Sequence, residues 1–177
     1  LGDAGYMVTG DAGIAERVRL YRSHGLESRD HCVLYGVNSR LDELHAAVLE
    51  LRLERLANVI ARRRHNVARY RELVHEGPIQ LPAEGPDEQI AWTLFNVMAD
   101  RRDELRAHLR EHGIETLLYY GTPLHLHPAA AAAGHTRGEL PVAEAQCDRV
   151  LALPHHQYLT DDQIVHVATT INTFYGS

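Results

Sequence analysis

The 177-residue chain contains no lysine, and all 18 of its Lys and Arg residues are arginines. An arginine guanidinium stays protonated in proteins and has no free amine that could act as a nucleophile. Chemistry that needs a side-chain amine is therefore excluded from these residues. Cysteine is scarce as well, since only Cys32 and Cys147 occur and they lie far apart in the sequence. Two such cysteines favour reduced thiols over a disulfide framework.

Long apolar runs are also missing. No stretch approaches the roughly 18 residues that a membrane-spanning helix needs, and no secretory signal pattern is visible. The formal net charge of −6 argues against a general nucleic-acid or membrane-surface role. With 45% hydrophobic and 24% charged residues, the composition is typical of a globular domain. We therefore expect a cytoplasmic protein with no nucleic-acid and no membrane partner.

The segment that starts at Gly36 carries the most specific local signal. It reads Gly36-Val-Asn-Ser-Arg-Leu-Asp-Glu-Leu-His-Ala-Ala47. Ser39, followed three residues later by Asp42 and then by apolar residues, predicts a capped helix start. The free N–H groups and the positive dipole of a helix start suit an anion such as a phosphate, and the same pattern also fits a purely structural cap. Arg40 would lie just inside this helix and oppose its dipole, which favours an anionic partner for its side chain.

The spacing of apolar residues predicts an α/β organisation. The expected elements are a strand at 6–9, a helix at 14–23, a loop at 27–35, one long helix at 39–75, a strand at 90–98, a helix at 101–112, a strand at 115–120, a loop at 121–138 and helices at 142–151 and 160–174. The long helix would measure about 50 Å and could join two domains. The part after residue 86 predicts a small α+β domain, whose last helix begins with a capping box at Thr160 and Gln163.

Five segments, in order, carry a resemblance to one protein family. They are Leu1-Gly-Asp-Ala-Gly-Tyr-Met-Val-Thr9, Arg22-Ser-His-Gly25, the segment from Gly36 to Ala47, Tyr120-Gly-Thr-Pro-Leu-His125, and Leu140-Pro-Val-Ala-Glu144 with the later Leu153-Pro154. These segments resemble the G-D-x-G, R-x-H-G, G-x-N-x-R, Y-x-x-P-L-H and closing motifs of the PLP-dependent sugar aminotransferases of the DegT/DnrJ/StrS family. His45 stands where that family usually has glutamine. The resemblance covers essentially the whole chain.

The resemblance implies a fold-type-I PLP transferase of the α/β class, represented by the end of its large domain and a small α+β C-terminal domain. Residues 1–38 would end the large PLP-binding domain, residues 39–76 would form a long bridging helix, and residues 77–177 would form the small domain. In the family the Schiff-base lysine precedes the G-D-x-G turn. It would therefore lie upstream of Leu1, so that this chain is expected to be the C-terminal part of a longer enzyme and to hold no catalytic residue itself.

The implied reaction moves an amino group from an amino acid, with glutamate as the expected donor, to a ketosugar that is usually nucleotide-linked. The implied cofactor is pyridoxal 5'-phosphate, and the active site would be shared between the two subunits of a homodimer. By the same resemblance, Asn38 would bind the cofactor phosphate of the neighbouring subunit. Substrate contacts are expected from Arg40, Tyr35, His24, Tyr120 and His125.

The residues themselves leave other roles open for three of these positions. Tyr35 also fits core packing, His24 also fits a helix-end residue, and His125 also fits an exposed loop histidine. Tyr119, beside Tyr120, is a further candidate for the substrate side of the site, because aromatic loop residues often contact ligands.

Histidine is abundant, with 13 residues, which raises the question of a metal site. The pairs His125-Leu-His127 and His155-His156 have no carboxylate or thiol at a recognised ligand spacing, so we expect no metal. Two alternatives from other functional classes remain. One is a non-catalytic binding or regulatory module derived from such an enzyme, and the other is a histidine-based metallohydrolase.

Overall fold

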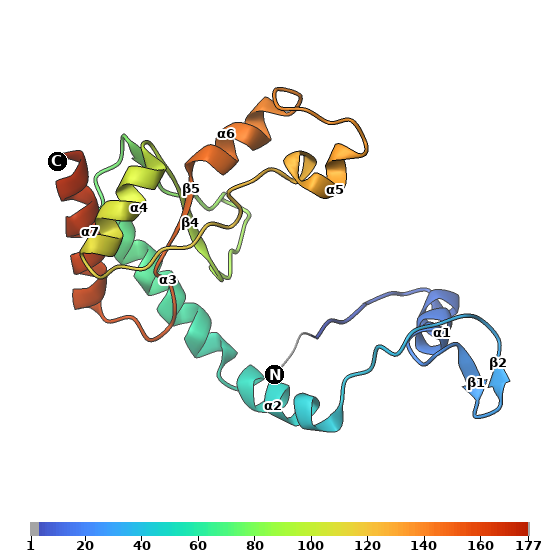
Figure 1. Cartoon of the computed structure of the whole chain (residues 1–177). Helices are drawn as coiled ribbons and strands as arrows, with labels where there is room; N and C mark the ends of the chain where they lie inside the picture. Colours follow the sequence, from blue (N-terminus) through green and yellow to red (C-terminus); the bar gives the residue numbers. More distant parts are fainter. Residues whose placement is uncertain (1–3, 177) are drawn as a thin grey trace. The chain divides into compact units, whose positions relative to one another are not determined.

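The computed structural model describes residues 4–176, apart from the side chain of Ala131. It divides into two compact units, Leu1–Leu56 and Ala57–Ser177, and each is described by itself (Figure 1). Leu1, Gly2 and Asp3, which begin the first of the family motifs, lie outside the described residues.

The first unit contains two helices and a small hairpin. Its elements are α1 (Ala12–Tyr21), β1 (Leu26–Ser28), β2 (His31–Cys32) and α2 (Glu43–Leu53). The carboxylate of Asp11 accepts a 3.0 Å hydrogen bond from Ile14 N and so caps α1. The antiparallel pair β1–β2 forms where a loop was expected. Residues 6–9 do not form the expected strand, because no described residue of this unit pairs with their backbone.

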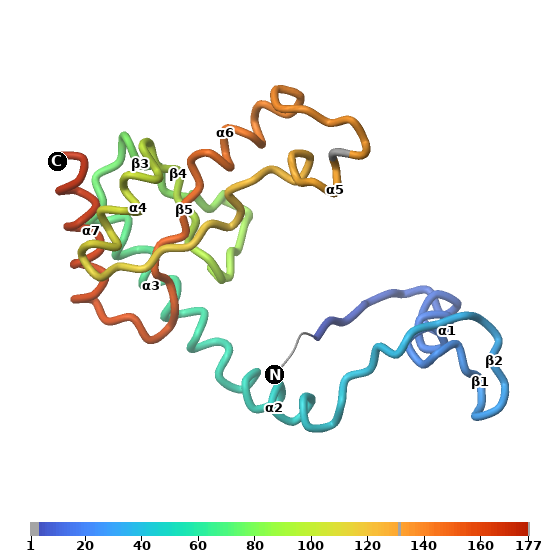
Figure 2. The backbone as a smooth tube through the Cα atoms, viewed as in Figure 1, coloured from blue at the N-terminus to red at the C-terminus, as the bar shows by residue number. Residues whose placement is uncertain are grey.

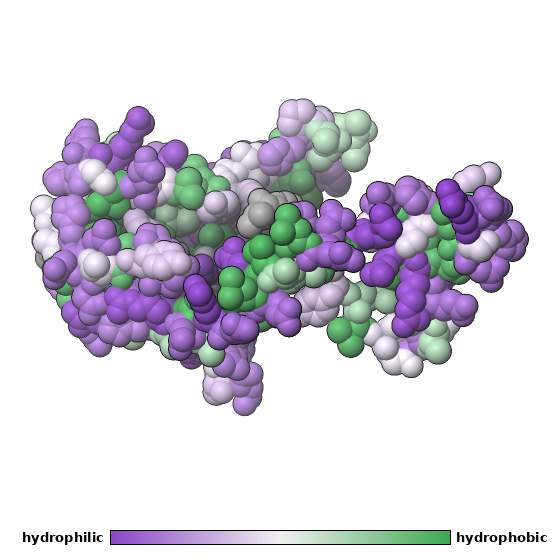
Figure 3. All heavy atoms as spheres, turned by 90° about the horizontal axis from the view of Figure 1, so that it is seen from below, coloured by the Kyte–Doolittle hydropathy of each residue, from purple (hydrophilic) through white to green (hydrophobic). Residues whose placement is uncertain are grey.

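This unit has no hydrophobic core of its own. Gly25 is its only buried residue among those described. Its exposed large hydrophobic residues are Tyr6, Met7, Val8, Ile14, Tyr21, Leu26, Val33, Tyr35, Val37, Leu41, Leu44, Leu49, Leu51, Leu53 and Leu56. Hydrophobic residues on the surface are visible as green spheres among the purple ones in Figure 3. The unit is therefore held together mainly by backbone hydrogen bonds and capping.

The single helix expected at 39–75 is wrong in two respects. It is divided into α2 and α3 (Leu56–Leu73) by a turn at Glu54 and Arg55. Its start also lies later than expected, because the N-cap of α2 is Asp42, whose side chain makes no capping hydrogen bond. Ser39 N instead donates to Arg22 O at 2.8 Å, which keeps residue 39 outside the helix. Arg40 therefore precedes the helix and does not oppose its dipole from within.

The second unit is built on a three-stranded antiparallel sheet. The order is β3–β4–β5, with β3 at Ile79–Gln80, β4 at Phe95–Ala99 and β5 at Val150–Leu153. Val97 of β4 lies opposite Leu151 of β5, and both are fully buried. The strand expected at 90–98 is thus shorter, and the one expected at 115–120 is reduced to an isolated bridge between Leu117 and Ala152.

Helices α3, α4 (Arg102–Glu111) and α7 (Asp161–Tyr175) contribute buried side chains to the core around this sheet. Helix α6 (Pro141–Arg149) contacts β4, and the short helices η1 (Leu124–Leu126) and α5 (Pro128–Ala131) contact each other. Helices α4 and α7 lie side by side (Figure 1). The capping box of α7 is confirmed, since Gln163 N donates to the Thr160 hydroxyl and Thr160 N donates to the Gln163 side chain. Tyr70 of α3 stacks on Phe95 at 5.2 Å between ring centroids.

None of the described helices is both long and apolar enough to cross a membrane. Cys32 and Cys147 are free thiols. In the first unit, the candidate residues are positioned by the end of α1 and residues 36–40. In the second unit, they are positioned by α6–β5 and residues 117–140.

Candidate cofactor and substrate site

Two of the family motifs meet in the first unit. His24 N donates to Val37 O at 3.0 Å, and Val37 N donates to Tyr21 O at 2.8 Å. Ser23 and Asn38 form an antiparallel bridge. The R-x-H-G and G-x-N-x-R segments are therefore held together by main-chain hydrogen bonds, which fix the backbone on both sides of Asn38.

Glycine is required at two positions of this junction. Gly25 has a φ of +72°, and an added Cβ would overlap the carbonyl oxygen of Leu34. At Gly36 a Cβ would lie 2.5 Å from Gly25 N and would also overlap the carbonyl oxygen of Tyr21. The close approach of the two segments thus depends on the absence of both side chains.

The side chains expected to bind ligands in this unit are exposed. Asn38, Arg40 and His24 all reach solvent, and Tyr35 is 99% exposed, so it does not pack in a core of this unit. Within the described part of the chain, Asn38 and Arg40 make no side-chain hydrogen bond or ion pair. Their polar groups are therefore free to bind a ligand. The roles assigned to these four residues stay predictions.

A groove of about 1020 Å³ lies beside this junction. Residues 4–9 line one part of it, and the rest is lined by Ala15, Val18, Arg19, Arg22, Ser39, Arg40, Leu41 and His45. The three guanidinium groups of Arg19, Arg22 and Arg40 in its lining make the groove suitable for an anionic ligand. Arg19, Arg22 and His45 line the groove and were not predicted as site residues. Arg19 lies one helical turn before Arg22, a spacing that a helical reading of 14–23 could have revealed.

In the second unit, Tyr119 and Tyr120 lie on a loop anchored to the sheet. Leu117 N donates to Ala152 O at 3.2 Å, and Ala152 N donates back to Leu117 O at 2.8 Å. The Asn96 side chain donates to Tyr119 O at 3.4 Å. Tyr120 is 74% exposed, so its ring is available to a ligand. Its role in substrate binding stays a prediction.

His125 lies in a different environment from Tyr120. It is only 8% exposed, and its Nε2 lies 3.0 Å from Oε1 of Glu144, which is itself 6% exposed. The same carboxylate oxygen accepts hydrogen bonds from Gly138 N at 2.8 Å and Leu140 N at 3.4 Å. The Gly138 amide contributes most to lowering the pKa of Glu144. The sequence does not predict Glu144 as the partner of His125, because the two residues are 19 positions apart and no local pattern links them.

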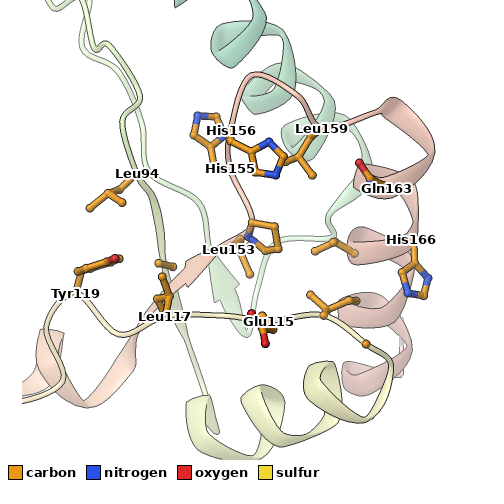
Figure 4. Close-up of a pocket in the computed structure, with 15 residues that line it drawn as sticks. Leu94, Glu115, Leu117, Tyr119, Leu153, His155, His156, Leu159, Gln163 and His166 are labelled. Atoms are coloured by element: carbon orange, nitrogen blue, oxygen red, sulfur yellow. The ribbon is translucent and has the colours of Figure 1, made fainter. Parts of the chain in front are cut away.

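The histidines between β5 and α7 line a second cavity of about 730 Å³ (Figure 4). Burial lowers the pKa of His155 to about 4 and outweighs the opposing effect of the nearby Trp92 backbone. Both ring nitrogens of His155 are buried, and neither has a hydrogen-bond partner among residues 4–176. His156 Nδ1 instead accepts from Tyr158 N at 3.2 Å. Over residues 4–176, no three His, Cys, Asp or Glu side chains are grouped so that they could hold a metal ion.

Comparison with known proteins gives a consistent result. The chain is 42% identical, over 96% of its length and 45% of the relative's, to dTDP-3-amino-3,4,6-trideoxy-alpha-D-glucose transaminase of Streptomyces venezuelae. It is 41% identical, over 97% of its length and 47% of the relative's, to the erythromycin biosynthesis sensory transduction protein EryC1 of Saccharopolyspora erythraea. The chain thus spans about half the length of the curated relatives it matches.

Solved structures of aminotransferases also match this chain. The crystal structure of S. venezuelae DesV in complex with a ketimine intermediate matches with a TM-score of 0.91 and 40% identity, over 96% of this chain and 46% of that one. The expected fold class, part of a PLP transferase of mixed helix and strand, is therefore confirmed. Residues 1–172 match the DegT/DnrJ/EryC1/StrS aminotransferase family as a whole. The chain belongs to the DegT/DnrJ/EryC1/StrS aminotransferase family.

Proposed function

We propose that this chain is the C-terminal part of an aminotransferase that uses pyridoxal 5'-phosphate and moves an amino group from an amino acid, with glutamate as the donor, to a nucleotide-linked ketosugar. The observation that carries this proposal is the junction of the two motif segments, which holds Asn38 beside a groove lined by arginines. Family membership over nearly the whole chain favours this function over a histidine-based metallohydrolase or a non-catalytic module.

The residues of the first unit fit the phosphate of the cofactor. The Asn38 amide is exposed and unpaired in the described structure, and Arg22 and Arg40 add positive charge to the neighbouring groove. A phosphate is bound well by such amide and guanidinium donors. Pyridoxal 5'-phosphate, when bound, supplies the electron sink for amino-group transfer. The amine that would hold it has to come from outside these 177 residues, since they include no lysine.

The remaining assignments follow from the same proposal. Residues 1–38 end the large domain, residues 39–76 bridge the domains, and residues 77–177 form the small domain. The active enzyme is a cytoplasmic homodimer with a shared site, in which Asn38 of one subunit serves the cofactor of the other. Arg40, Tyr35, His24, Tyr120 and His125 belong to the substrate side.

The test uses the full-length protein as its gene encodes it. Purified enzyme should show the visible absorbance of bound pyridoxal 5'-phosphate and should transfer the glutamate amino group to a dTDP- or UDP-linked ketosugar. Asn38→Ala should weaken cofactor retention roughly 10- to 150-fold, because one hydrogen bond to a charged group contributes about 1.5–3 kcal/mol.

Asn58→Ala is the matched control, because Asn58 is an exposed asparagine within α3. It should leave cofactor retention unchanged. Equal retention in both variants would refute the role of Asn38, and a protein that neither binds the cofactor nor aminates any ketosugar would refute the proposed activity.

A further inference from the structure

The loop that carries Tyr119 and Tyr120 is anchored at both of its ends to one continuous piece of chain. On its N-terminal side, Leu117 exchanges two backbone hydrogen bonds with Ala152 of β5. On its C-terminal side, His125 pairs with Glu144 of α6 at 3.0 Å. Helix α6 runs directly into β5 at Val150, so both anchors belong to the α6–β5 element.

At the second anchor, Glu144 contacts other groups besides His125. Oε1 of Glu144 also accepts from the amides of Gly138 and Leu140, and Oε2 lies 4.0 Å from the Arg137 guanidinium. The segment after Tyr120 runs out through η1 to α5 and returns along α6, as Figure 2 traces. A single buried carboxylate therefore ties the outgoing chain at His125 to the returning chain at Gly138 and Leu140.

Burial makes this anchor strong. The side chains of His125 and Glu144 are 7% and 8% exposed, so solvent cannot replace the bonds that they make. Loss of Glu144 would leave the His125 ring buried without this partner, and loss of His125 would leave the buried Glu144 carboxylate with the amides of Gly138 and Leu140 as its remaining hydrogen-bond donors. Either loss costs more than breaking an exposed pair would. The exposed pair His135–Glu139, at 2.9 Å in the same segment, provides a natural comparison.

We propose that the His125–Glu144 pair is a clasp that sets the position of the Tyr119–Tyr120 loop, and that His125 acts on the ketosugar as a positioning residue and not by direct contact. The inference rests on the proposed function. Tyr120, exposed and within five residues of the clasp, is the group through which the clasp affects the sugar. The length of chain between the two anchors, residues 118–124, is too short to move freely once both are fixed.

The proposal requires His125 to donate a hydrogen bond to Glu144, whereas a direct contact with the sugar would require its imidazole ring. Substitutions can separate these two properties. A Gln side chain can place its amide where His125 Nε2 lies and donate to Glu144, but it lacks the imidazole. An Asn amide has the same chemistry and falls short of Glu144. His125→Gln should therefore preserve the clasp, whereas His125→Asn and His125→Ala should break it.

The experiment compares these variants in the full-length holoenzyme with His135→Ala as the matched control. Breaking the clasp should raise KM for the ketosugar about tenfold and leave the amino-donor half-reaction within about twofold of the parent. His125→Gln should be clearly less impaired than His125→Asn and His125→Ala, and His135→Ala should stay close to the parent in both measurements. Hydrogen exchange at the amides of Gly138 and Leu140 should speed up only in the Asn and Ala variants.

The proposal is overturned if His125→Gln is as impaired as His125→Ala while Gly138 and Leu140 stay protected, because the imidazole would then act on the substrate itself. It is also overturned if the His125→Asn and His125→Ala variants behave like His135→Ala. If His125→Ala does not fold, the difference in KM between His125→Asn and His125→Gln decides whether the hydrogen bond to Glu144 is what matters. A parent enzyme that aminates no ketosugar would instead refute the proposed function, and the exchange measurement would still decide whether His125 helps to hold the returning chain at Gly138 and Leu140.

Discussion

At Gly36 the backbone of the motif segment comes so close to the end of α1 that a side chain has no room. An added Cβ would overlap main-chain atoms of Tyr21 and lie 2.5 Å from Gly25 N, and neither neighbour can rotate away as a side chain could. Gly36→Ala should therefore push the segment off α1 and displace Asn38. We expect a loss of about 1–3 kcal/mol in the free energy of unfolding, the usual cost of overpacking.

The same displacement should weaken cofactor retention in the holoenzyme, which absorbance after gel filtration would measure. Gly10→Ala is the control, because no atom lies within 4 Å of an added Cβ at that position. A Gly36→Ala enzyme as stable and as well loaded as the Gly10→Ala enzyme would show that the junction does not position Asn38.

His155 makes the stability of the second unit depend on pH. Burial beside Phe95, whose ring centroid lies 5.8 Å away, lowers its pKa to about 4, against an ordinary value of 6.5. Between these values the unfolded chain binds a proton at this residue that the folded chain does not bind. The free energy of unfolding should therefore fall as pH drops from 6.5 to about 4, by at most about 1.4 kcal/mol per pH unit.

Denaturant unfolding at several pH values would test this effect. His155→Leu removes the titrating group and should flatten the pH dependence in that window, so that the variant gains stability relative to the parent as pH falls. His127→Gln, at an exposed position, should keep the parent's slope. If the free energy of unfolding of His155→Leu depended on pH as steeply as that of the parent, the effect would not come from His155.

At the scale of elements, local signals predicted helices better than strands. The helices α1, α4 and α7 were predicted within two residues at either end, because each has a regular apolar spacing and α7 has its own cap. Strand β5 was missed, since Val150–Leu153 continues an apolar helical pattern without a break. Its pairing with β4 comes from contacts distant in sequence, which periodicity cannot report.

The site shows the same division. The resemblance identified the segments around His24 and Asn38, but it did not reveal that their backbones pair with each other. Ser39 looked like a cap because of its spacing to Asp42. In the structure the backbone amide of Ser39 donates to the carbonyl oxygen of Arg22, and this tertiary hydrogen bond overrides the local preference. The partnership of His125 with Glu144 was hidden for a similar reason, since nothing in the sequence between them marks a contact.

At the scale of the whole molecule, the two units differ in how they are stabilised. The second has a continuous core that includes Tyr70, Phe95, Leu105, Leu151 and Ile164, all fully buried. The first buries only Gly25 among its described residues. Hydrophobic burial is the dominant favourable contribution to folding, so a unit without it has little resistance to local opening.

Hydrogen exchange of the 177-residue chain alone should therefore report two levels of protection. Amides of β4, β5 and α7 should exchange slowly, at rates set by unfolding of the core, whereas amides of α1 and α2 should exchange almost as fast as in an unstructured peptide. The measurement belongs at a concentration where gel filtration shows a monomer, because a second copy could cover the exposed hydrophobic residues. Equal protection of α1, α2 and α7 in that monomer would contradict the prediction. In the full-length enzyme, protection of α1 and α2 should rise to the level of α7, since the hydrophobic residues exposed here, such as Ile14 and Leu44, would then have a surface to pack against.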